Sequence, residues 1–595
     1  MKKRLFAFCA LAALLLTCWI PVQAAEDYDA LAVAEGYHAR VGEAEAAYDG
    51  GAFTGYIKFN NDLSGAGGRD NALAKVPAGS TVTLIADVTI TTELYLQGQY
   101  TVDGDGHTLT GAFRSDSSGA DVTVKNLNIV LNAVDGGGFG RYIIQAEGGC
   151  HVLFENCDFT VTGAPQYGLF VVRGHVEMDG CTLTWTNANA GGNKDVFRLD
   201  NGSSEVTLTD TEVTLPTDDS KLTIVGFYNP GTLVLRGDTV LTAAEGKAIV
   251  VGSALPSITM DTSVVAPVTP SDYPVTRYDV WDGSVDTSWF DESSIQDSYE
   301  LDTAAKLAGL AKLISDAGTA NWPYAAAEKD VTFYVTIHLN LAGLEWLPIG
   351  SSYDTRFGGK LVGRVGAAGE PAIIQGLKVV GANDNAGFVG SIDTGGEISN
   401  FIFESPVVTS AKNAVGVVCG YARSGGTFTD ITVKNATLSA ENAKWVGGIC
   451  AYSKYGADTY ENCVFEGDIV ASGESAMVGG IVGNAVIGAV LTNCYVSGSI
   501  SASGATDQVG GMVGAIDAGA ALTMTDCQFD GYLQNANTSA TANGALVGSV
   551  AAGETAVSLT RVFLSGVSVG SGANAAAGYS WLGALTGSGS VTLTA

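Results

Sequence analysis

The stretch QVGGMVGAIDAGAALTMTDCQFDGYLQ, residues 508–534, opens on Val-Gly-Gly and carries Thr-Asp-Cys before a final apolar–polar alternation. Similar stretches stand before and after it, with glycine-rich openings at Gly387, Gly416, Gly447, Gly479, Gly510, Gly544 and Gly583. The successive spacings are 29, 31, 32, 31, 34 and 39 residues. A repeat of about 30 residues indicates an array of stacked units, so this period decides the fold class.

Each unit predicts one turn of a parallel β-helix. No helical period runs through the units, and short apolar–polar alternations broken by Gly, Asn and Asp are typical of strands and turns. Three strands of about five residues, with their turns, fill one unit. Each turn then pairs its backbone with the turns above and below it, as in a right-handed parallel β-helix.

A second column after the glycine-rich openings predicts the interior of the stack. Its central residues are Phe401, Ile431, Cys463, Cys494, Cys527 and Val562. Equivalent residues of successive turns stack at the strand spacing of about 4.8 Å, so these six are expected to form one interior ladder. A cysteine on such a ladder is a small apolar side chain, and packing is favoured over disulfide formation.

Asn or Asp precedes most ladder positions. The residues are Asn400, Asp430, Asn462, Asn493 and Asp526. Both residue types tolerate a left-handed backbone better than other non-glycine residues. We therefore expect a bend with positive φ at each of them.

The first half of the chain contains a similar repeat with different residues, as in HVLFENCDF and HVEMDGCTL. Its aligned apolar positions are Val122, Val152, Val176, Val206 and Leu233, spaced by 30, 24, 30 and 27 residues. The inner ladder that follows them is predicted to contain Leu127, Cys157, Cys181 and Thr211. The predicted fold class is all-β, with two right-handed parallel β-helices, each with a short N-terminal helical cap.

The expected domain order follows from these patterns. It is a signal peptide (1–24), an N-terminal cap region (25–78), a first β-helix (79–266), a linker (267–298), a capping helix with entry strands (299–350) and a second β-helix (351–595). The capping helix is predicted in LDTAAKLAGLAKLISDAG, residues 301–318, where Asp302 or Thr303 caps its start and Gly318 ends it.

The net charge and the N-terminal targeting pattern limit the functions that this chain can have. Lys2, Lys3 and Arg4 precede the apolar stretch 5–20, which is typical of a secretory signal and predicts a secreted or cell-surface protein. Removing these three cations takes the net charge from −32 to −35, a surface that repels nucleic acid. No later apolar run reaches about 18 residues, so no transmembrane segment is expected after signal removal.

The second half also resembles a known class of proteins. The residues that carry the likeness are WDGSVDTSWF (281–290), TAAKLAGLAKL (303–313), LNLAGLEWLPIG (339–350), FGGKLVG (357–363) and the glycine-rich repeats. Residues 281–595 resemble exported bacterial GLUG-motif proteins and are similar to repeats of immunoglobulin A protease-like and adhesin-like surface proteins. The first half resembles a generic pectate-lyase-like β-helix. The resemblance implies surface display and adhesion. No His-Glu-x-x-His motif of zinc proteases occurs in the sequence, so the proteolytic half of such proteases is not expected in this chain.

One column combines histidines and carboxylates. His151 and His175 each precede an inward valine, so they should face outward on adjacent turns, with Asp121 and Glu205 on the turns to either side. Such a column can hold a divalent transition metal or respond to pH. The plainer interpretation is a solvated column of charged side chains, because ligand geometry does not follow from alignment. No other cofactor is predicted.

A second set of residues has the carboxylates and cations that cleavage of a polysaccharide needs. Arg173, Lys194, Asp195, Arg198 and Asp200 lie in VVRGHV and NKDVFRLDNG. Paired carboxylates can hydrolyse a glycosidic bond, and carboxylates with Arg or Lys can eliminate across one. The plainer interpretation is ordinary outward-facing strand charge.

These patterns favour a non-catalytic, adhesin-like surface protein that binds a glycan or protein of a host or neighbouring cell, or acts as a spacer. One alternative is a polysaccharide lyase or glycoside hydrolase with its site on the lateral face of the first β-helix. Another alternative is the accessory region of a longer surface protein. Fold alone does not decide among them.

Overall fold

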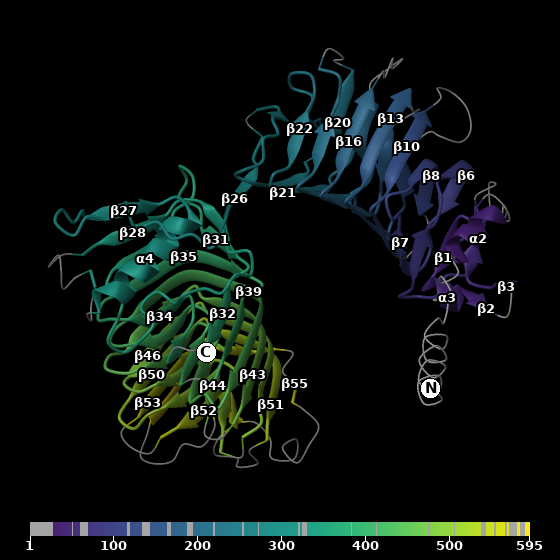
Figure 1. Ribbon diagram of the computed structural model, residues 1–595. Coiled ribbons are helices and arrows are strands. Elements are labelled where there is room, and N and C mark those ends of the chain that lie inside the picture. The colour runs from purple at the N-terminus through teal and green to yellow at the C-terminus, as the bar shows by residue number, and fades with distance from the viewer. Residues whose placement is uncertain are drawn as a thin grey trace, which may run out of the picture. The chain divides into compact units, whose positions relative to one another are not determined.

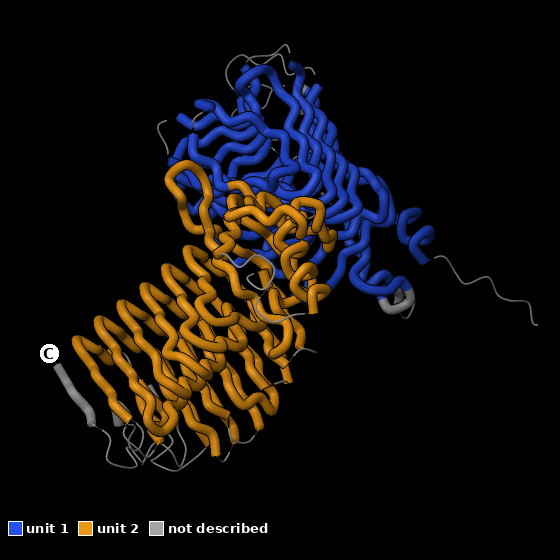
Figure 2. Tube along the Cα trace, turned by 90° about the vertical axis from the view of Figure 1, so that its left-hand side faces the viewer, with its two compact units in different colours: residues 1–276 blue, residues 277–595 orange. Residues whose placement is uncertain are grey.

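The computed structural model describes most of residues 28–594 (Figure 1). The gaps are 50–51, 60–69, 116–118, 134–142, 164–167, 187–193, 218–220, 253–254, 272, 319–321, 324–329, 382–383, 412, 474–475, 505, 537–542, 552–554, 566–567, 570–579 and 583–589. The predicted signal peptide (1–24) and the last glycine-rich opening at Gly583 lie outside the described residues. The chain divides into two compact units, Met1–Thr276 and Arg277–Ala595 (Figure 2), and the division falls inside the segment 267–298.

The first unit is a stack of parallel strands, and one of its ladders joins strands in sequence order. These are β5 (Thr81–Leu84), β7 (Gln99–Asp103), β9 (Asp121–Lys125), β12 (His151–Glu155), β15 (His175–Asp179), β18 (Glu205–Thr209), β21 (Thr232–Arg236) and β24 (Ser257–Asp261). Val122, Val152, Val176, Val206 and Leu233 are direct partners along it and are fully buried. Alternation along each strand therefore separates an inner apolar face from an outer polar face.

A branched sheet forms the other two sides of the first unit. One branch contains β6 (Val88–Tyr95), β8 (Thr108–Ser115), β10 (Asn128–Ala133), β13 (Asp158–Gly163), β16 (Thr182–Thr186), β19 (Glu212–Thr214) and β22 (Val240–Thr242). The other branch leaves β8 through β11 (Ile144–Ala146), β14 (Gly168–Val172), β17 (Lys194–Leu199), β20 (Leu222–Phe227), β23 (Ile249–Val251) and β25 (Val268–Thr269). A turn such as β12–β13–β14 thus contributes three strands, one to each ladder.

Antiparallel pairing and short helices precede the first ladder. The elements are α2 (Tyr28–Ala34), β1 (Ala39–Val41), α3 (Ala44–Ala47), β2 (Tyr48–Asp49), β3 (Ala52–Phe53) and β4 (Tyr56–Ile57). Strand β1 pairs antiparallel with both β4 and β5. Backbone hydrogen bonds of β5, the first strand of the ladder, are therefore satisfied on the N-terminal side.

The second unit starts with a few less regular strands and one long helix. They are β26 (Thr276–Val280), β27 (Ser298–Leu301), α4 (Ala304–Ala317), β28 (Thr332–Val335), β29 (His338–Asn340), β30 (Lys360–Gly363), β31 (Ala372–Gln375) and β32 (Lys378–Gly381). The Thr303 side chain caps α4 by accepting from Lys306 N, and Gly318 ends it at φ 59°. Leu307, Leu310 and Ile314 of α4 are fully buried in the unit's core.

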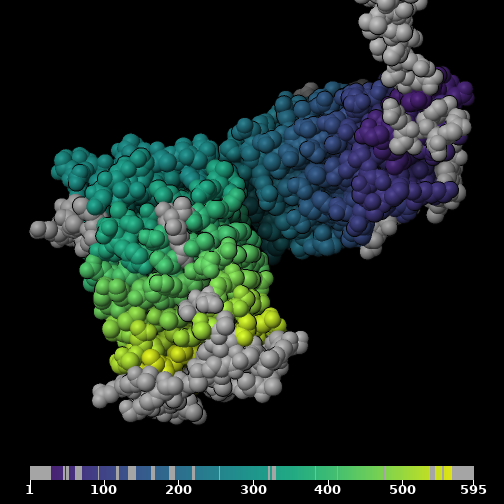
Figure 3. All heavy atoms as spheres, turned by 60° about the horizontal axis from the view of Figure 1, so that its bottom comes forward, coloured from purple at the N-terminus to yellow at the C-terminus, as the bar shows by residue number. Residues whose placement is uncertain are grey.

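The glycine-rich repeats then wind as successive turns (Figure 2). One face consists of β35 (Glu397–Glu404), β36 (Val407–Ser410), β39 (Thr427–Glu441), β42 (Asp458–Glu461), β43 (Val464–Ser472), β46 (Gly488–Thr492), β47 (Tyr495–Ala502), β50 (Ala521–Thr525), β51 (Gln528–Asn535), β53 (Ala556–Thr560), β54 (Phe563–Leu564), β55 (Ser568–Val569) and β57 (Ser590–Thr594). The other consists of β33 (Asn385–Ala386), β34 (Val389–Ile392), β37 (Ala414–Gly416), β38 (Cys419–Ala422), β40 (Trp445–Gly447), β41 (Cys450–Ser453), β44 (Met477–Gly479), β45 (Val482–Ala485), β48 (Gln508–Gly510), β49 (Val513–Ile516), β52 (Asn543–Val550) and β56 (Ser580–Leu582). The surface of this unit changes from teal to yellow in layers, so its turns stack in chain order (Figure 3).

The interior ladder of the second unit lies inside this stack. Phe401 and Ile431 are direct partners, and Phe401, Ile431, Cys463, Cys494, Cys527 and Val562 are all buried. The left-handed bends predicted before them are present, with φ of 64°, 54°, 54°, 53° and 56° at Asn400, Asp430, Asn462, Asn493 and Asp526. In the first unit, Leu127, Cys157, Cys181 and Thr211 are likewise buried.

The all-β fold class and the parallel β-solenoid are confirmed. The finer prediction, two separate right-handed β-helices that each carry a helical cap, stays a prediction. Within the part of the chain that the structure describes, no helix is long and apolar enough to cross a membrane.

Candidate functional site

A column of charged side chains follows the strands β11, β14 and β17. Their last residues, Ala146, Val172 and Leu199, are cross-strand partners and point into the core. The next residue of each turn is Glu147, Arg173 or Asp200, and all three side chains are partly exposed. They therefore stack on the outside at the strand spacing of about 4.8 Å.

Arg173 bridges the two carboxylates of this column. Its Nη1 donates to both oxygens of Glu147 at 3.1 Å, while its Nε and Nη2 donate to Asp200 Oδ2 at 3.2 and 2.9 Å. The hydrogen bonds to Asp200 and Glu147 raise the pKa of the Arg173 guanidinium above its usual value. Bidentate, charge-assisted contacts of this kind hold a long side chain in one orientation.

The network continues from Asp200 to a buried carboxylate. Arg198 Nε donates to Asp200 Oδ1 at 3.2 Å, and the Arg198 guanidinium lies 3.7 Å from the centre of the Tyr228 ring. The Tyr228 hydroxyl donates to Asp195 Oδ2 at 3.0 Å. Gly226 leaves room for this carboxylate, because a Cβ there would lie 2.5 Å from Asp195 Oδ1.

The network also continues across β8 and β6. Arg114 Nη1 donates to Gln145 Oε1 at 2.6 Å, and Arg114 lies 3.8 Å from Glu147 and 4.0 Å from Glu93. Gln145 in turn donates to Glu147. We call this connected set the polar row, and it consists of Glu93, Arg114, Gln145, Glu147, Arg173, Asp195, Arg198, Asp200 and Tyr228.

The two aspartates of the polar row differ in their electrostatics. Burial raises the pKa of Asp195 to about 6, against the Tyr228 hydrogen bond and the charges of Arg198, Lys247 and Lys194. For Asp200, burial also acts to raise the pKa, but hydrogen bonds and charges from Arg173 and Arg198 outweigh it and lower the pKa. Asp195 is thus the carboxyl that takes up a proton more readily.

The structure brings the sequence-predicted candidates together. Arg173, Asp195, Arg198 and Asp200 belong to one network, and the charge of Lys194 acts on Asp195. The sequence reasoning missed the remaining members of the polar row, which are Glu93, Arg114, Gln145, Glu147 and Tyr228. Glu147 and Tyr228 follow the inward residue that ends a strand of the third ladder, whereas the sequence alignment used the first strand of each turn.

The histidine column lies on the outer face of β9, β12, β15 and β18. Asp121, His151, His175 and Glu205 are successive partners in register. The His151 and His175 rings stack with centroids 4.6 Å apart and planes 25° apart. His151 Nδ1 lies 2.9 Å from Asp121 Oδ1, and His175 Nε2 lies 3.8 Å from Glu205 Oε1.

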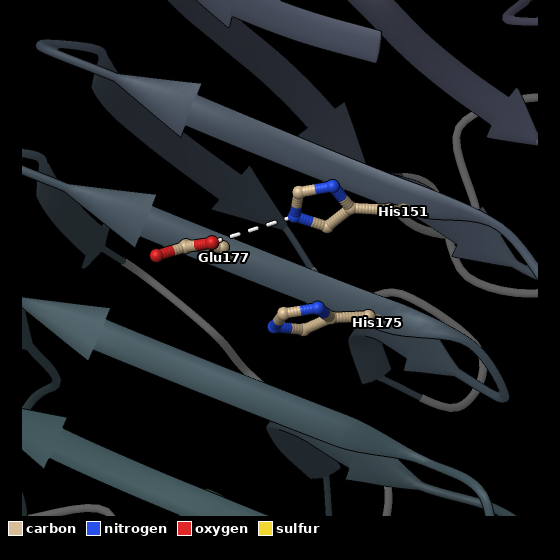
Figure 4. Close-up of side chains that lie close together, drawn as sticks. All are labelled: His151, His175 and Glu177. Atoms are coloured by element: carbon tan, nitrogen blue, oxygen red, sulfur yellow. Dashed lines mark hydrogen bonds and ion pairs between the residues drawn. The ribbon is translucent and has the colours of Figure 1, made fainter. Parts of the chain in front are cut away.

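Glu177 joins this column, and the sequence reasoning missed it. It stands two residues after His175 on the same strand, so period-two alternation places it on the same face. Glu177 Oε2 lies 3.4 Å from His151 Nε2, and ligand atoms of His151, His175 and Glu177 all lie within 4.8 Å of one another (Figure 4). Burial and the charge of His151 lower the pKa of His175, against the carboxylates of Glu205 and Glu177.

Comparison with known proteins adds little to this geometry. No family model and no curated protein matches the chain. A solved structure, that of a putative immunoglobulin A1 protease from Bacteroides ovatus, is similar at 19% identity and a TM-score of 0.34. The match covers 46% of this chain and 77% of that one, and at this level of similarity it carries no argument about function.

Proposed function

We propose that this chain is an exported, adhesin-like surface protein that binds a glycan, without turnover, on the polar row of its first unit. The predicted secretory signal supports export, and the strongly acidic composition argues for a partner other than nucleic acid. A protein of a host or neighbouring cell is the other partner that the same surface accommodates.

The observation that carries the proposal is the clamping of Arg173 between Glu147 and Asp200 on neighbouring turns. Hydrogen-bonding groups that ion pairs hold in one orientation at the ends of strands bind with less loss of conformational freedom than free side chains on loops. Tyr228 is 47% exposed, with Arg198 over its ring, and offers aromatic surface on which a sugar ring can pack. Polar groups in a rigid row, with an aromatic side chain at its side, suit an extended chain of hydroxyl-bearing units.

The electrostatics favour binding over hydrolysis. A general acid has to hold a proton near neutral pH, and Arg173 and Arg198 lower the pKa of Asp200. Asp195 has the raised pKa, but it is only 5% exposed and accepts the Tyr228 hydroxyl. The two aspartates therefore do not form an exposed acid and base facing a common space.

A second candidate, a polysaccharide lyase or glycoside hydrolase, rests on Asp195 alone. A pKa of about 6 is the value expected of a carboxylic general acid or base, and Arg198 lies close enough to act on this carboxyl electrostatically. In that case movement of Tyr228 would have to expose Asp195 to the substrate.

The finer architecture belongs to the same proposal. We propose that each compact unit is a right-handed β-helix, the second closed by α4 at its N-terminal end and the first by the segment around α2. The buried face of α4 and the antiparallel pairing of β1 with β5 support this arrangement. A spacer role, or a place as the accessory region of a longer surface protein, is compatible with it.

The test is a glycan array probed with residues 25–595, followed by affinity measurement on the best ligand. Arg173→Ala and Tyr228→Ala are expected to weaken binding at least tenfold, and Arg173→Lys to weaken it also because the bidentate contacts are lost. Arg561→Ala is the matched control, since Arg561 is a half-exposed arginine paired with Asp526 in the second unit. Unchanged binding in Arg173→Ala and in Tyr228→Ala would refute the site.

The same ligand separates binding from catalysis. Incubation with the protein should release neither reducing nor unsaturated ends. Release that disappears in Asp195→Asn would favour the enzymatic candidate instead. Binding to a protein array without glycan binding would mean that the partner is a protein. The polar row would then remain the proposed binding surface.

A further inference from the structure

We propose that His151, His175 and Glu177 form a binding site for a divalent transition-metal ion such as Zn²⁺, on the outer face of β12 and β15. The site is independent of the polar row, because it is built on a different ladder of the first unit. It adds a metal-binding activity to the proposed glycan binding.

The three side chains converge on one place outside the strands. Both imidazoles extend from neighbouring strands to the same side, and the Glu177 carboxylate lies beside them (Figure 4). The ligand atoms of the three residues lie within 4.8 Å of one another. Zinc bonds to nitrogen and carboxylate oxygen are about 2.0–2.2 Å long and tetrahedral, so two ligand atoms of one ion lie about 3.4 Å apart. Rotations about the side-chain bonds have to bring the ligand atoms to that separation, and the strands keep their register while they do so.

The His151 ring is oriented by Asp121. Its Nδ1 lies 2.9 Å from Asp121 Oδ1, so a proton on Nδ1 is shared with that carboxylate. Nε2 then carries the free lone pair and faces Glu177 at 3.4 Å. A carboxylate on the remote nitrogen of a histidine is the usual arrangement behind a metal-binding imidazole, because it fixes the ring and its tautomer.

A further carboxylate lies within reach of the proposed ion. Glu205 Oε1 lies 3.8 Å from His175 Nε2, on the strand next to β15. Two imidazoles and one or two carboxylates are a borderline donor set, which favours Zn²⁺, Co²⁺, Ni²⁺ or Cu²⁺ over Mg²⁺ or Ca²⁺. The side chains of His151, His175 and Glu177 are 34%, 29% and 28% exposed, so an ion can enter from solvent.

The arrangement also fits the charge of the site. Asp121, Glu177 and Glu205 place three carboxylates around two imidazoles. A divalent cation between the rings would be attracted by these carboxylates.

The experiment is a titration of the full chain after signal removal (residues 25–595) with Zn²⁺, measured calorimetrically and by metal content after dialysis. Any oligohistidine tag has to be cleaved, because it binds the same ions. Millimolar Mg²⁺ and Ca²⁺ are present throughout to occupy sites made of carboxylates alone. One equivalent of Zn²⁺ is expected to remain bound.

Three variants test the ligand set. His175→Ala and Glu177→Gln are each expected to weaken Zn²⁺ binding at least tenfold, and Asp121→Asn by about 10–100-fold through the orientation of His151. His107→Ala is the matched control, because His107 also lies beside an aspartate, at 3.4 Å from Asp87, but outside the column. Circular dichroism and thermal unfolding of each variant establish that it is folded.

A second readout does not depend on affinity. Co²⁺ bound by nitrogen and oxygen ligands gives visible absorption bands, which His175→Ala should abolish and His107→Ala should leave. Failure of the wild-type chain to retain a stoichiometric ion in the presence of Mg²⁺ and Ca²⁺ would overturn the proposal. Retention of the ion by His175→Ala with an unchanged Co²⁺ spectrum would overturn it as well.

Discussion

The Tyr228 hydroxyl donates a 3.0 Å hydrogen bond to Asp195, a carboxyl that is only 5% exposed and whose pKa burial raises to about 6. Because the folded-state pKa exceeds the ordinary value of 3.8, folding favours the protonated form. The stabilising contribution of this group is complete below pH 3.8 and is lost as the pH rises through about 6. The charged carboxylate therefore destabilises the first unit at neutral pH.

Asp195→Asn should remove this dependence. We expect the variant to exceed the wild type in free energy of unfolding by about 1–3 kcal/mol at pH 8, with the difference vanishing near pH 4. Denaturant unfolding of both proteins at a series of pH values measures the effect. Equal stability at pH 8 would contradict this prediction and would show that Arg198 and Tyr228 compensate the buried charge fully.

Gly226 and Asp195 are predicted to be coupled through space. A Cβ at Gly226 lies 2.5 Å from Asp195 Oδ1 and 2.7 Å from its Cγ, so Gly226→Ala has to displace the carboxylate. The expected loss of stability is about 1–3 kcal/mol, the usual range for overpacking. In an Asp195→Ala background the same substitution should cost less than half as much. Additive losses in this double-mutant cycle would argue against the contact.

The cysteines of the solenoid are predicted to stay reduced and unreactive in the folded protein. Cys150, Cys157, Cys181, Cys419, Cys450, Cys463, Cys494 and Cys527 carry free thiols and are buried. The hydrogen bonds of Cys494 with Cys463 and of Cys527 with Cys494, together with burial, raise the pKa of Cys494 and Cys527, so little of the reactive thiolate is present at these two positions. A thiol reagent should modify none of them in the native protein and all eight in denaturant. Fewer than eight in denaturant would indicate disulfides along the ladder.

The left-handed backbone at Asn462 should make stability depend on side-chain branching at this position. Asn462 has a φ of 54°, donates from Nδ2 to Asp430 Oδ1 at 2.7 Å and accepts from Asn493 Nδ2 at 2.8 Å. Asn462→Gly keeps the permitted backbone and loses only the exposed amide ladder, so it should cost under about 1 kcal/mol. Asn462→Val adds a β-branched side chain at positive φ and should cost about 1–2 kcal/mol more. Thermal unfolding of the two variants gives the comparison, and an equal cost would mean that the backbone relaxes out of the left-handed region.

Part of the candidate metal site could be predicted from the alternation of residues within individual strands. The pairing of His151 with His175 was predictable because both residues precede an aligned inward valine, and alternation then sets their face. Glu177 was accessible by the same alternation, two residues on, but alignment of the histidines alone did not include it. Glu147, Arg173, Asp200 and Tyr228 were not predictable as a column. They follow the third strand of each turn, and the connections from β10 to β11, β13 to β14 and β16 to β17 differ in length.

The amino-acid sequence by itself determined the repeat, the parallel stacking, the buried ladders and the left-handed bends. Each of these recurs once per turn, and a stack of equivalent turns imposes its period on the chain. Only the tertiary structure decided which outward side chains of the third ladder meet, and that Glu177 lies beside His151. Connections of unequal length separate the strands of one turn, so an alignment made on the first strands does not carry over to the third strands, which backbone hydrogen bonding pairs directly.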